Sequence, residues 1–214
     1  MSRKIFYHYG VIGAGKSTEI QRSVYQYESK GFSTLVLKPS FDTRDGQNVI
    51  YSRQTGKTIP CRNIEDYIFP DDYDLSYKLC SEYHIVFVDE VQFCSVAEIK
   101  MLDKLAKDGN IRIVVYGLYK DFKDEFWEST ALLDKIAGVK TAIPAVCEAC
   151  GCGAEHNIRL DKYGNIVKTG EQNVLGGTES GLPSYITLCS KCKEKKDIGN
   201  TLREKFNKLR RKGL

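Results

Sequence analysis

The sequence lacks any long hydrophobic run. Nowhere in its 214 residues do 18 apolar residues follow one another, which argues against a membrane-spanning helix. No apolar stretch of signal-peptide length follows Met1–Lys4 either, because Tyr7, His8, Tyr9 and a glycine-rich turn come at once. We therefore expect a cytoplasmic protein in a reducing compartment. Its eight cysteines should be thiols or metal ligands and not disulfides.

A strong overall charge is also missing, since the net charge is only +4. Residues 191–214 contain ten Lys and Arg against three acidic residues, a local charge of +7, so the rest of the chain carries −3. A basic end of this kind is more often a solvated helix or a frayed terminus than a nucleic-acid patch. The sequence has no internal repeat, and this basic tail is its only biased segment.

Short apolar segments alternate with helix-like segments over the first two thirds of the chain. Strands are predicted at residues 4–9, 34–37, 84–88 and 111–116, and helices at 18–30, 73–79 and 97–107. Residues 40–61 hold turn formers and charges and are predicted to be irregular. The alternation favours an α/β fold for residues 1–143, with a P-loop (RecA-like), mostly parallel sheet and helices on both faces.

The composition changes near residue 143. Glycines are frequent and five cysteines occur between Cys147 and Cys192, with hairpin-like stretches at Asn157–Leu160 and Tyr185–Leu188. This segment has too little apolar material for a core of its own. We therefore predict a small zinc-ribbon domain at residues 144–193, followed by the basic tail at 194–214.

A phosphate-binding loop pattern occupies Gly10–Ser17, between a predicted strand and a predicted helix. Glycines let backbone N–H groups turn toward phosphate oxygens, and the helix offers its positive N-terminus. Lys16 can place its charge on the same oxygens, and the Ser17 hydroxyl can bind Mg²⁺. The alternative, a glycine-rich turn without function, does not account for the strand and helix on either side.

An acidic pair, Asp89 and Glu90, follows the apolar segment Ile85–Val88. A buried strand that delivers a carboxylate to Mg²⁺ beside a phosphate loop is a feature of phosphoryl-transfer sites. Asp89 is the metal-side candidate, and Glu90 can accept the proton of the nucleophile. A strand that simply ends in acidic residues is the alternative.

Two CxxC pairs, Cys147/Cys150 and Cys189/Cys192, stand 38 residues apart. Four thiolates in two close pairs suit tetrahedral Zn²⁺ in a structural site, which would also stabilise a segment without a core. Cys152 could chelate as well, and redox chemistry is the other use of a CxxC pair. The remaining cysteines, at positions 61, 80 and 94, are predicted to be buried as small apolar residues.

In their order along the chain, these elements resemble the zinc-containing (type II) thymidine kinases. The resemblance covers residues 3–192 and leaves out the basic tail. It is carried by the phosphate loop, Asp42-Thr43-Arg44, Ser52-Arg53, Asp89-Glu90-Val91-Gln92-Phe93, Gly117-Leu118, Asp121-Phe122, the two CxxC pairs, and Gly176-Gly177 with Tyr185.

The resemblance implies transfer of the γ-phosphoryl group of ATP to the 5′-hydroxyl of thymidine, with Mg²⁺ in the reaction, structural Zn²⁺ at the four cysteines, and Glu90 as the catalytic base. Residues implied to contact ATP and Mg²⁺ are Gly10, Val11, Ile12, Gly13, Ala14, Gly15, Lys16, Ser17, Asp42, Arg44, Asp89, Val91 and Gln92. Residues implied to contact thymidine are Phe93, Leu118, Phe122, Trp127, Asn157, and, in a lasso loop over the base, Gln172, Asn173, Val174, Leu175, Gly176 and Tyr185. The family further implies a homo-oligomer, commonly a tetramer, with feedback by dTTP and neither a membrane nor a nucleic-acid partner.

Three features depart from the family pattern. The loop interior Val11–Ala14 has smaller residues than many members, Trp127 stands where Phe is usual, and the stretch Gly176–Tyr185 is longer than the usual lasso. These departures leave the phosphate contacts in place and bear on substrate preference.

A nucleic-acid-dependent ATPase or zinc-ribbon nucleic-acid-binding protein is the main alternative function. Asp89-Glu90-Val91-Gln92 resembles the DExQ box of helicases, and the tail is basic. Helicase motors join two such α/β domains, whereas 214 residues leave room for one, and the cysteine-rich segment lacks the alternation of aromatic and basic residues found in base-stacking surfaces. A nucleotide switch without catalysis would leave Glu90 without a role.

Overall fold

The computed structural model describes residues 4–161, 163, 165–173, 184–195 and 198–199. The chain divides into two compact units. The first, which we call the sheet unit, comprises residues 1–10, 15–119 and 126–143, and the second, the cysteine unit, comprises 11–14, 120–125 and 144–214. Two short loops from the N-terminal part of the chain are thus grouped with the C-terminal part. The division into three segments expected from the sequence, 1–143, 144–193 and 194–214, stays a prediction.

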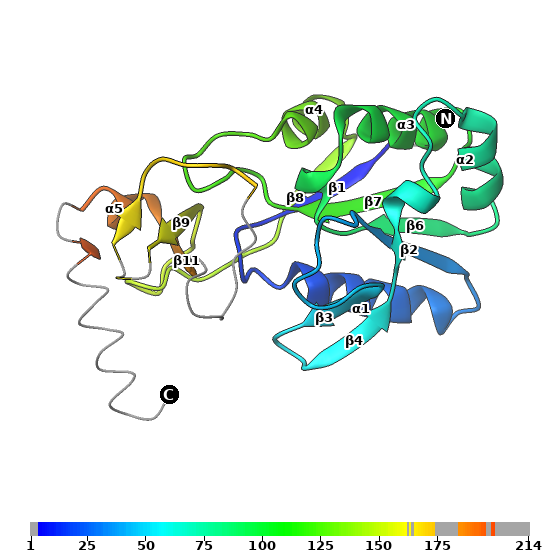
Figure 1. Ribbon diagram of the computed structural model, residues 1–214. Helices are drawn as coiled ribbons and strands as arrows, with labels where there is room; N and C mark the ends of the chain where they lie inside the picture. Colours follow the sequence, from blue (N-terminus) through cyan, green and yellow to red (C-terminus); the bar gives the residue numbers. More distant parts are fainter. Residues whose placement is uncertain (1–3, 162, 164, 174–183, 196–197, 200–214) are drawn as a thin grey trace. The chain divides into compact units, whose positions relative to one another are not determined.

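A six-stranded sheet forms the centre of the sheet unit (Figure 1), with the strand order β5-β2-β6-β7-β1-β8. Every neighbouring pair in it is parallel. Its strands are β1 (Phe6–Tyr9), β2 (Thr34–Lys38), β5 (Arg62–Asn63), β6 (Ile85–Val88), β7 (Arg112–Gly117) and β8 (Val139–Ala142). The predicted α/β fold with a parallel sheet is confirmed. The edge strands β5 and β8 were not predicted.

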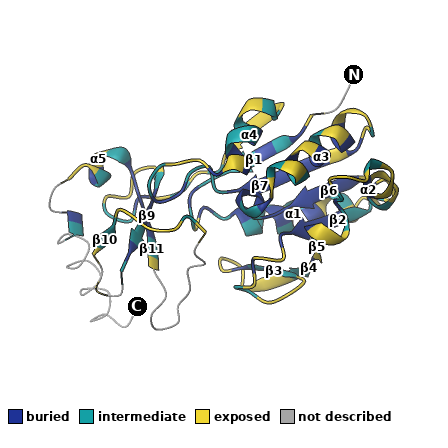
Figure 2. Cartoon of the chain, turned by 45° about the horizontal axis from the view of Figure 1, so that its top comes forward, coloured by how far each residue is buried: buried dark blue, intermediate teal, exposed yellow. Residues whose placement is uncertain are grey.

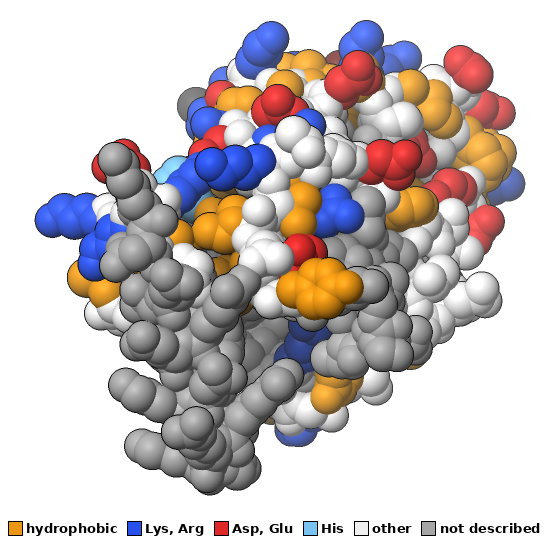
Figure 3. All heavy atoms as spheres, turned by 60° about the vertical axis from the view of Figure 1, so that its left-hand side comes forward, with side chains coloured by type: hydrophobic (Ala, Val, Ile, Leu, Met, Phe, Trp, Pro, Cys, Tyr) orange, Lys and Arg blue, Asp and Glu red, His pale blue; other side chains and the backbone are white. Residues whose placement is uncertain are grey.

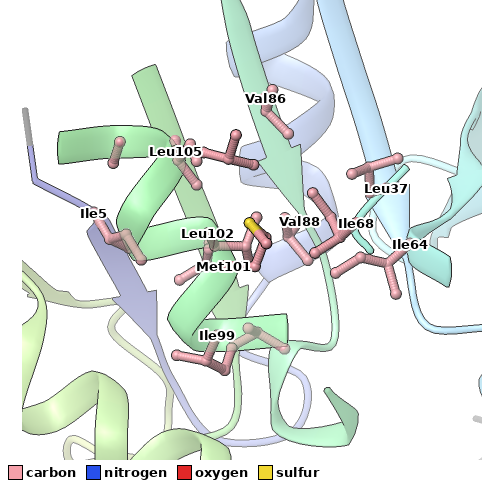
Figure 4. Close-up of a cluster of buried hydrophobic side chains, with 14 of the residues drawn as sticks. Ile5, Leu37, Ile64, Ile68, Val86, Val88, Ile99, Met101, Leu102 and Leu105 are labelled. Carbon is pink, nitrogen blue, oxygen red and sulfur yellow. The ribbon is translucent and has the colours of Figure 1, made fainter. Parts of the chain in front are cut away.

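Helices cover both faces of this sheet, whose central strands β2, β6 and β7 are largely buried (Figure 2). The helix α1 (Lys16–Glu28) packs on one face, where its Ile20 joins Ile85 and Phe87 in a buried cluster. The other face is covered by α2 (Tyr73–Cys80), α3 (Val96–Lys107) and α4 (Glu128–Ile136). There Val86 and Val88 lie against Leu102 of α3 (Figure 4). Successive residues of β6 thus point to opposite faces, as the period of a strand requires.

The helix α3 has local signals at both ends. The Ser95 hydroxyl accepts a hydrogen bond from the Glu98 N–H, and the Glu98 carboxylate accepts one from the Ser95 N–H, which together form a capping box. Lys104 and Lys107 lie in the last turn, where positive charge is favourable. The predicted start at Ala97 and end at Lys107 agree with the observed bounds to one residue.

The prediction of an irregular segment at residues 40–61 was wrong in part. An antiparallel hairpin of β3 (Val49–Ser52) and β4 (Lys57–Pro60) lies within it, followed by a single 3₁₀ turn at Ile64–Asp66. Its turn uses Gly56 at φ 68°, and Ile50 packs into the cluster under α1. The turn residues were recognised, but the short β-prone runs on either side of them were not.

The cysteine unit contains a three-stranded antiparallel sheet in the order β10-β9-β11. Its elements are β9 (His156–Leu160), β10 (Ile166–Val167), β11 (Ser184–Leu188) and the short helix α5 (Ser190–Lys193). The two predicted hairpin-like stretches do pair with each other. Of the basic tail, only residues 194–195 and 198–199 fall within the described residues. No helix in the described parts of the chain is long and apolar enough to cross a membrane.

Candidate active site

Four neighbouring strands of the sheet unit end at the same edge of the sheet. Because the strands are parallel, the segments that follow β1, β2, β6 and β7 begin at their carboxyl ends. These segments carry Gly10, Asp42, Asp89 and Leu118 respectively. The carboxyl edge of a parallel sheet is the usual place for a ligand site in such folds. The start of the phosphate loop, the Asp-Thr-Arg element, the acidic pair and Leu118 thus follow strands that end at one edge.

The phosphate loop leads directly into α1. Gly15 occupies the N-cap of that helix at φ 90°, and Gly13 lies at φ 74°, which are conformations that favour glycine. A side chain at Gly15 would also come within 3.0 Å of the Gln54 amide from the hairpin. Lys16 is buried, with its Nζ 3.4 Å from the Gly10 carbonyl oxygen. Burial lowers the pKa of Lys16, and the carboxylates of Glu90 and Asp89 oppose that shift.

Asp89 and Glu90 follow β6 at once. The Glu90 N–H donates to Asp89 Oδ1 at 2.9 Å, and Glu90 itself adopts left-handed backbone angles, φ 51° and ψ 39°. This conformation is unusual for a residue with a side chain and turns the chain sharply after the strand. Burial, together with the neighbouring Glu90 charge, raises the pKa of Asp89 to about 7. Ionisation of a buried carboxylate is costly, but it becomes favourable once a cation binds beside the carboxylate.

Glu90 is held by an arginine and an amide. Arg44 Nη2 donates to Glu90 Oε1 at 2.6 Å and Arg44 Nε to Asp42 Oδ1 at 2.7 Å, while the Gln92 side-chain amide donates to Glu90 Oε2. Burial alone would raise the pKa of Glu90. The charges of Arg44 and Lys16, with the hydrogen bonds from Gln92 and Arg44, lower it below its ordinary value. The Glu90 carboxylate is therefore ionised near neutral pH and can accept a proton.

Gln92 lies inside the protein and braces the site. Its Oε1 accepts the Leu118 N–H at 2.9 Å, and its backbone carbonyl accepts the Ser129 hydroxyl at 2.9 Å. The absence of a side chain at Gly117 makes room for it, since a Cβ there would lie 2.6 Å from Gln92 Oε1. Val91 is fully buried in the core under α3. Contact of Gln92 and Val91 with ATP stays a prediction.

Aromatic side chains gather next to Glu90. The rings of Phe93 and Trp127 meet edge-on at 6.5 Å, and the ring of Phe41 lies 5.0 Å from that of Phe93. Trp127 is buried, whereas Phe41 is 47% exposed. Sequence reasoning missed Phe41, although it immediately precedes the Asp-Thr-Arg element. An exposed ring packed on a buried pair can provide a wall for a flat ligand.

Leu118 follows β7 in the sheet unit, whereas the other predicted thymidine contacts lie in the cysteine unit. Phe122 is buried, with the Arg159 guanidinium 5.2 Å from its ring centre, and Asn157 is buried in β9. Tyr185 pairs with Arg159 across β11 and β9. Gln172 is half-buried and Asn173 exposed, and the remaining lasso positions, Val174, Leu175 and Gly176, lie outside the described residues.

The four cysteines of the CxxC pairs form one cluster. Their sulfur atoms all lie within 4.8 Å of one another, and those of Cys150 and Cys189 are 3.6 Å apart. A tetrahedral zinc site with bonds of about 2.3 Å has sulfur separations of about 3.8 Å, so this cluster fits such an ion. Burial opposes ionisation of Cys147, but the backbone N–H groups of Cys189, Cys150 and Ala149 help to lower its pKa to about 6. Cys152 lies outside the cluster and is exposed.

Cys61, Cys80 and Cys94 are buried in the sheet unit, as predicted. Burial raises the pKa of Cys61 to about 11 and that of Cys80 to about 12. These thiols are therefore neutral and unreactive at physiological pH.

Comparison with known proteins gives a consistent result. Residues 3–193 match the family model described as thymidine kinase. The chain belongs to the thymidine kinase family. It is 33% identical over 192 residues to the thymidine kinase of Coxiella burnetii, covering 88% of this chain and 93% of the relative. It is 30% identical to that of Legionella pneumophila (strain Lens), covering 96% and 97%. With enterobacteria phage T4 thymidine kinase the identity is 33%, covering 87% and 93%. The protein is thus a nucleoside kinase, and ATP is its phosphoryl donor.

Among solved structures, the chain is similar to a Pif1 helicase from Bacteroides in complex with ADP-AlF3 and ssDNA. The TM-score is 0.41 at 15% identity, covering 66% of this chain and 38% of that one. The chain thus spans well under half of that helicase, and the likeness is too low to carry an argument.

Proposed function

We propose that Glu90 is the general base in transfer of the γ-phosphoryl group of ATP to the 5′-hydroxyl of thymidine. The observation that carries this proposal is the Glu90 carboxylate held by Arg44 and Gln92 at the sheet edge that also carries Lys16. The charges of Arg44 and Lys16 lower its pKa, which favours the ionised form. A base in this position accepts the hydroxyl proton as the oxygen attacks phosphorus. The γ-phosphoryl group moves to that oxygen, and ADP leaves.

The rest of the phosphate site neutralises and orients charge. Backbone N–H groups of the loop and the N-terminus of α1 face the phosphates, and Lys16 adds a positive charge whose hydration has already been removed by burial. Arg44, fixed by Asp42, holds the Glu90 carboxylate and would add a positive charge beside the phosphates. Phosphoryl transfer depends mainly on such positioning and charge stabilisation.

Mg²⁺ would be held by the Ser17 hydroxyl and the Asp89 carboxylate, the oxygen ligands that this ion prefers. When bound, it neutralises charge on the β- and γ-phosphates. The raised pKa of the buried Asp89 fits this role, since a nearby cation restores its ionised form. The four clustered cysteines would hold a structural Zn²⁺, which leaves no open coordination position for chemistry.

Thymidine would place its flat base against the aromatic group of Phe41, Phe93 and Trp127, with Leu118 as a further wall. The resemblance implies Phe122 as another contact. Asn157 and the lasso positions Gln172–Gly176 and Tyr185 complete the set. The methyl group that separates thymine from uracil is worth about 1–3 kcal/mol in such a pocket. On the resemblance alone, we also propose a cytoplasmic homo-oligomer, a tetramer, with feedback by dTTP.

A nucleic-acid-dependent ATPase is the second candidate, favoured by the Asp89–Gln92 sequence and the basic tail. On the face drawn in Figure 3, both basic and acidic side chains of the described residues are seen. Stimulation of ATP hydrolysis by single-stranded DNA, without nucleoside phosphorylation, would favour this candidate.

The test of the kinase mechanism is Glu90→Gln, which keeps the shape of the side chain and removes its charge. We expect kcat for thymidine to fall by about 10²–10⁴, while Mg-ATP affinity changes only a few-fold. Phosphorylation of a panel of nucleosides by radiolabelled ATP measures the first, and calorimetry the second. Glu82→Gln, at an exposed position just before β6, is the matched control and should keep full activity. Near-normal turnover of Glu90→Gln would exclude Glu90 as the base.

A further inference from the structure

We infer that Asn157 is a positioning residue that joins the phosphate loop to the 120–125 loop and so couples the binding of the two substrates. Asn157 lies in β9 with only 4% of its surface exposed. Its Oδ1 accepts the backbone N–H of Ile12 at 2.8 Å, and its Nδ2 donates to the Lys120 carbonyl at 2.9 Å. One side-chain amide thus bridges two backbone segments that are 108 residues apart in sequence.

The bridge uses both halves of the amide. An apolar residue at position 157 would remove the acceptor of the Ile12 N–H and one hydrogen bond to the Lys120 carbonyl, and losing hydrogen bonds to buried backbone groups is unfavourable. The Ile12 N–H is engaged by protein and is not directed at phosphate, and the Ala14 N–H donates to the Val11 carbonyl within the loop. Asn157 therefore fixes the conformation from which the glycine-rich loop presents its remaining N–H groups.

The 120–125 loop is held by β9 at two further points. His156 Nδ1 lies 2.7 Å from Asp124 Oδ1, and the Arg159 guanidinium lies over the Phe122 ring. Phe122 is a candidate wall of the thymine site. Three residues of one strand thus position the loop that carries this wall, and the middle one also holds the phosphate loop.

The strand β9 is itself braced from the cysteine cluster. Asn157 pairs with Thr187 of β11, and Glu148 lies between Cys147 and Cys150. The Glu148 N–H donates to the Thr187 carbonyl at 2.9 Å, and the Thr187 N–H donates to Glu148 Oε1 at 3.0 Å. These hydrogen bonds connect the CxxC segment of the cysteine cluster to Thr187, the strand partner of Asn157. The cluster is therefore connected to the phosphate loop through Thr187 and Asn157.

This inference rests on the proposed function for the identity of the two substrates. The binding of an ATP analogue without thymidine tests the inference independently of that function. The probe is a non-hydrolysable ATP analogue with Mg²⁺, titrated calorimetrically into the full chain with and without thymidine. The variant is Asn157→Leu, which keeps the size of the side chain and removes both hydrogen bonds. Asn157→Ala, which also lacks both bonds, is the second variant, and Asn165→Ala, in an exposed turn of the same unit, is the control.

We expect both variants at position 157 to bind the analogue about tenfold more weakly without thymidine, equivalent to about 1.4 kcal/mol. Any enhancement of analogue binding by thymidine should shrink toward one, and the control should match the wild type. An analogue affinity unchanged from the wild type, with only the KM for thymidine raised, would overturn the inference and leave Asn157 as a contact of the nucleoside alone.

Amide hydrogen exchange gives a measurement that needs no folded variant. The Ile12 N–H of the ligand-free wild type should be protected, and rapid exchange there would overturn the inference. A wild type that binds the analogue but does not phosphorylate thymidine would refute the proposed function. The inferred role of Asn157 would still stand or fall on the exchange and the analogue affinity.

Discussion

The two units of the chain are stabilised by different means. In the sheet unit, aliphatic side chains from strands and helices fill both faces of a parallel sheet. Among the described residues of the cysteine unit, a buried cluster includes three of the four candidate zinc ligands, Cys147, Cys189 and Cys192, beside a few aliphatic residues. A short segment cannot bury enough apolar surface to offset its conformational entropy, and a bound metal can supply the difference. The first unit should therefore be sensitive to volume in its core and the second to its thiols.

The largest expected effect comes from removing one thiol, which should destabilise the cysteine unit and leave the sheet unit folded. Cys189→Ser takes away a ligand of the proposed zinc site, so we expect loss of the metal, unfolding of the cysteine unit, and a fall in kinase activity of at least about 100-fold. Binding free energies of structural zinc are large, about 10–16 kcal/mol in small peptides. Zinc content is measured by mass spectrometry. Unfolding of the sheet unit is followed by the fluorescence of Trp127, the only tryptophan of the chain, which is buried there.

In Cys189→Ser, the denaturation midpoint of the sheet unit, measured by Trp127 fluorescence, should change little because the sheet unit has its own core. The matched control is Cys152→Ser, whose thiol is exposed and outside the cluster, and which should retain a full equivalent of zinc. One zinc per chain in Cys189→Ser would refute the ligand assignment. Loss of the cooperative unfolding transition measured by Trp127 fluorescence would show that the stability of the sheet unit depends on the cysteine unit.

The reverse experiment removes volume from the sheet unit. Leu102 is fully buried on α3, so Leu102→Ala should destabilise this unit by about 2–5 kcal/mol through lost burial and a residual cavity. Urea denaturation followed by Trp127 gives the change, and zinc content should stay at the wild-type value. Lys100→Ala, at an exposed position of the same helix, should change stability by less than about 0.5 kcal/mol. Loss of zinc from Leu102→Ala would contradict the separation of the units.

The smallest expected effect concerns the end of the same helix. Ser95→Ala removes the side-chain acceptor of the capping box, and we expect a loss of about 1 kcal/mol of stability. The urea midpoint of the sheet unit, measured by Trp127 fluorescence, should fall slightly, with no change in zinc content or in the KM for either substrate. A cost above that of Leu102→Ala would mean that the core contributes less to this unit than its burial suggests.

Much of this architecture could be predicted because neighbouring residues carry the signal. Apolar runs such as Ile85–Val88 mark buried parallel strands, and the Gly10–Ser17 pattern and the two CxxC pairs each place their chemistry within a few positions. The four thiols belong to two short segments, so their cluster needs only one long-range event, the pairing of β9 with β11. The predicted roles of the individual site residues stay predictions.

What could not be predicted depends on contacts between distant segments. The hairpin β3–β4 was not predicted because turn-forming residues dominate its sequence. Packing of Ile50 in the cluster that includes residues of α1 stabilises it. Gln92 follows Glu90 by two positions in sequence, but its bracing role depends on Leu118, Ser129 and the space left by Gly117. The bridge from Asn157 to Ile12 spans 145 residues and has no local signature.

The left-handed backbone at Glu90 has a consequence for engineering. A side chain in this conformation costs about 1–2 kcal/mol relative to glycine, and the turn it makes directs the carboxylate toward Arg44. A search for stabilising substitutions guided by backbone preference alone would choose glycine at position 90. Under the role of catalytic base proposed for Glu90, that variant would be more stable but would no longer turn over, because stability and activity make opposite demands on this one residue.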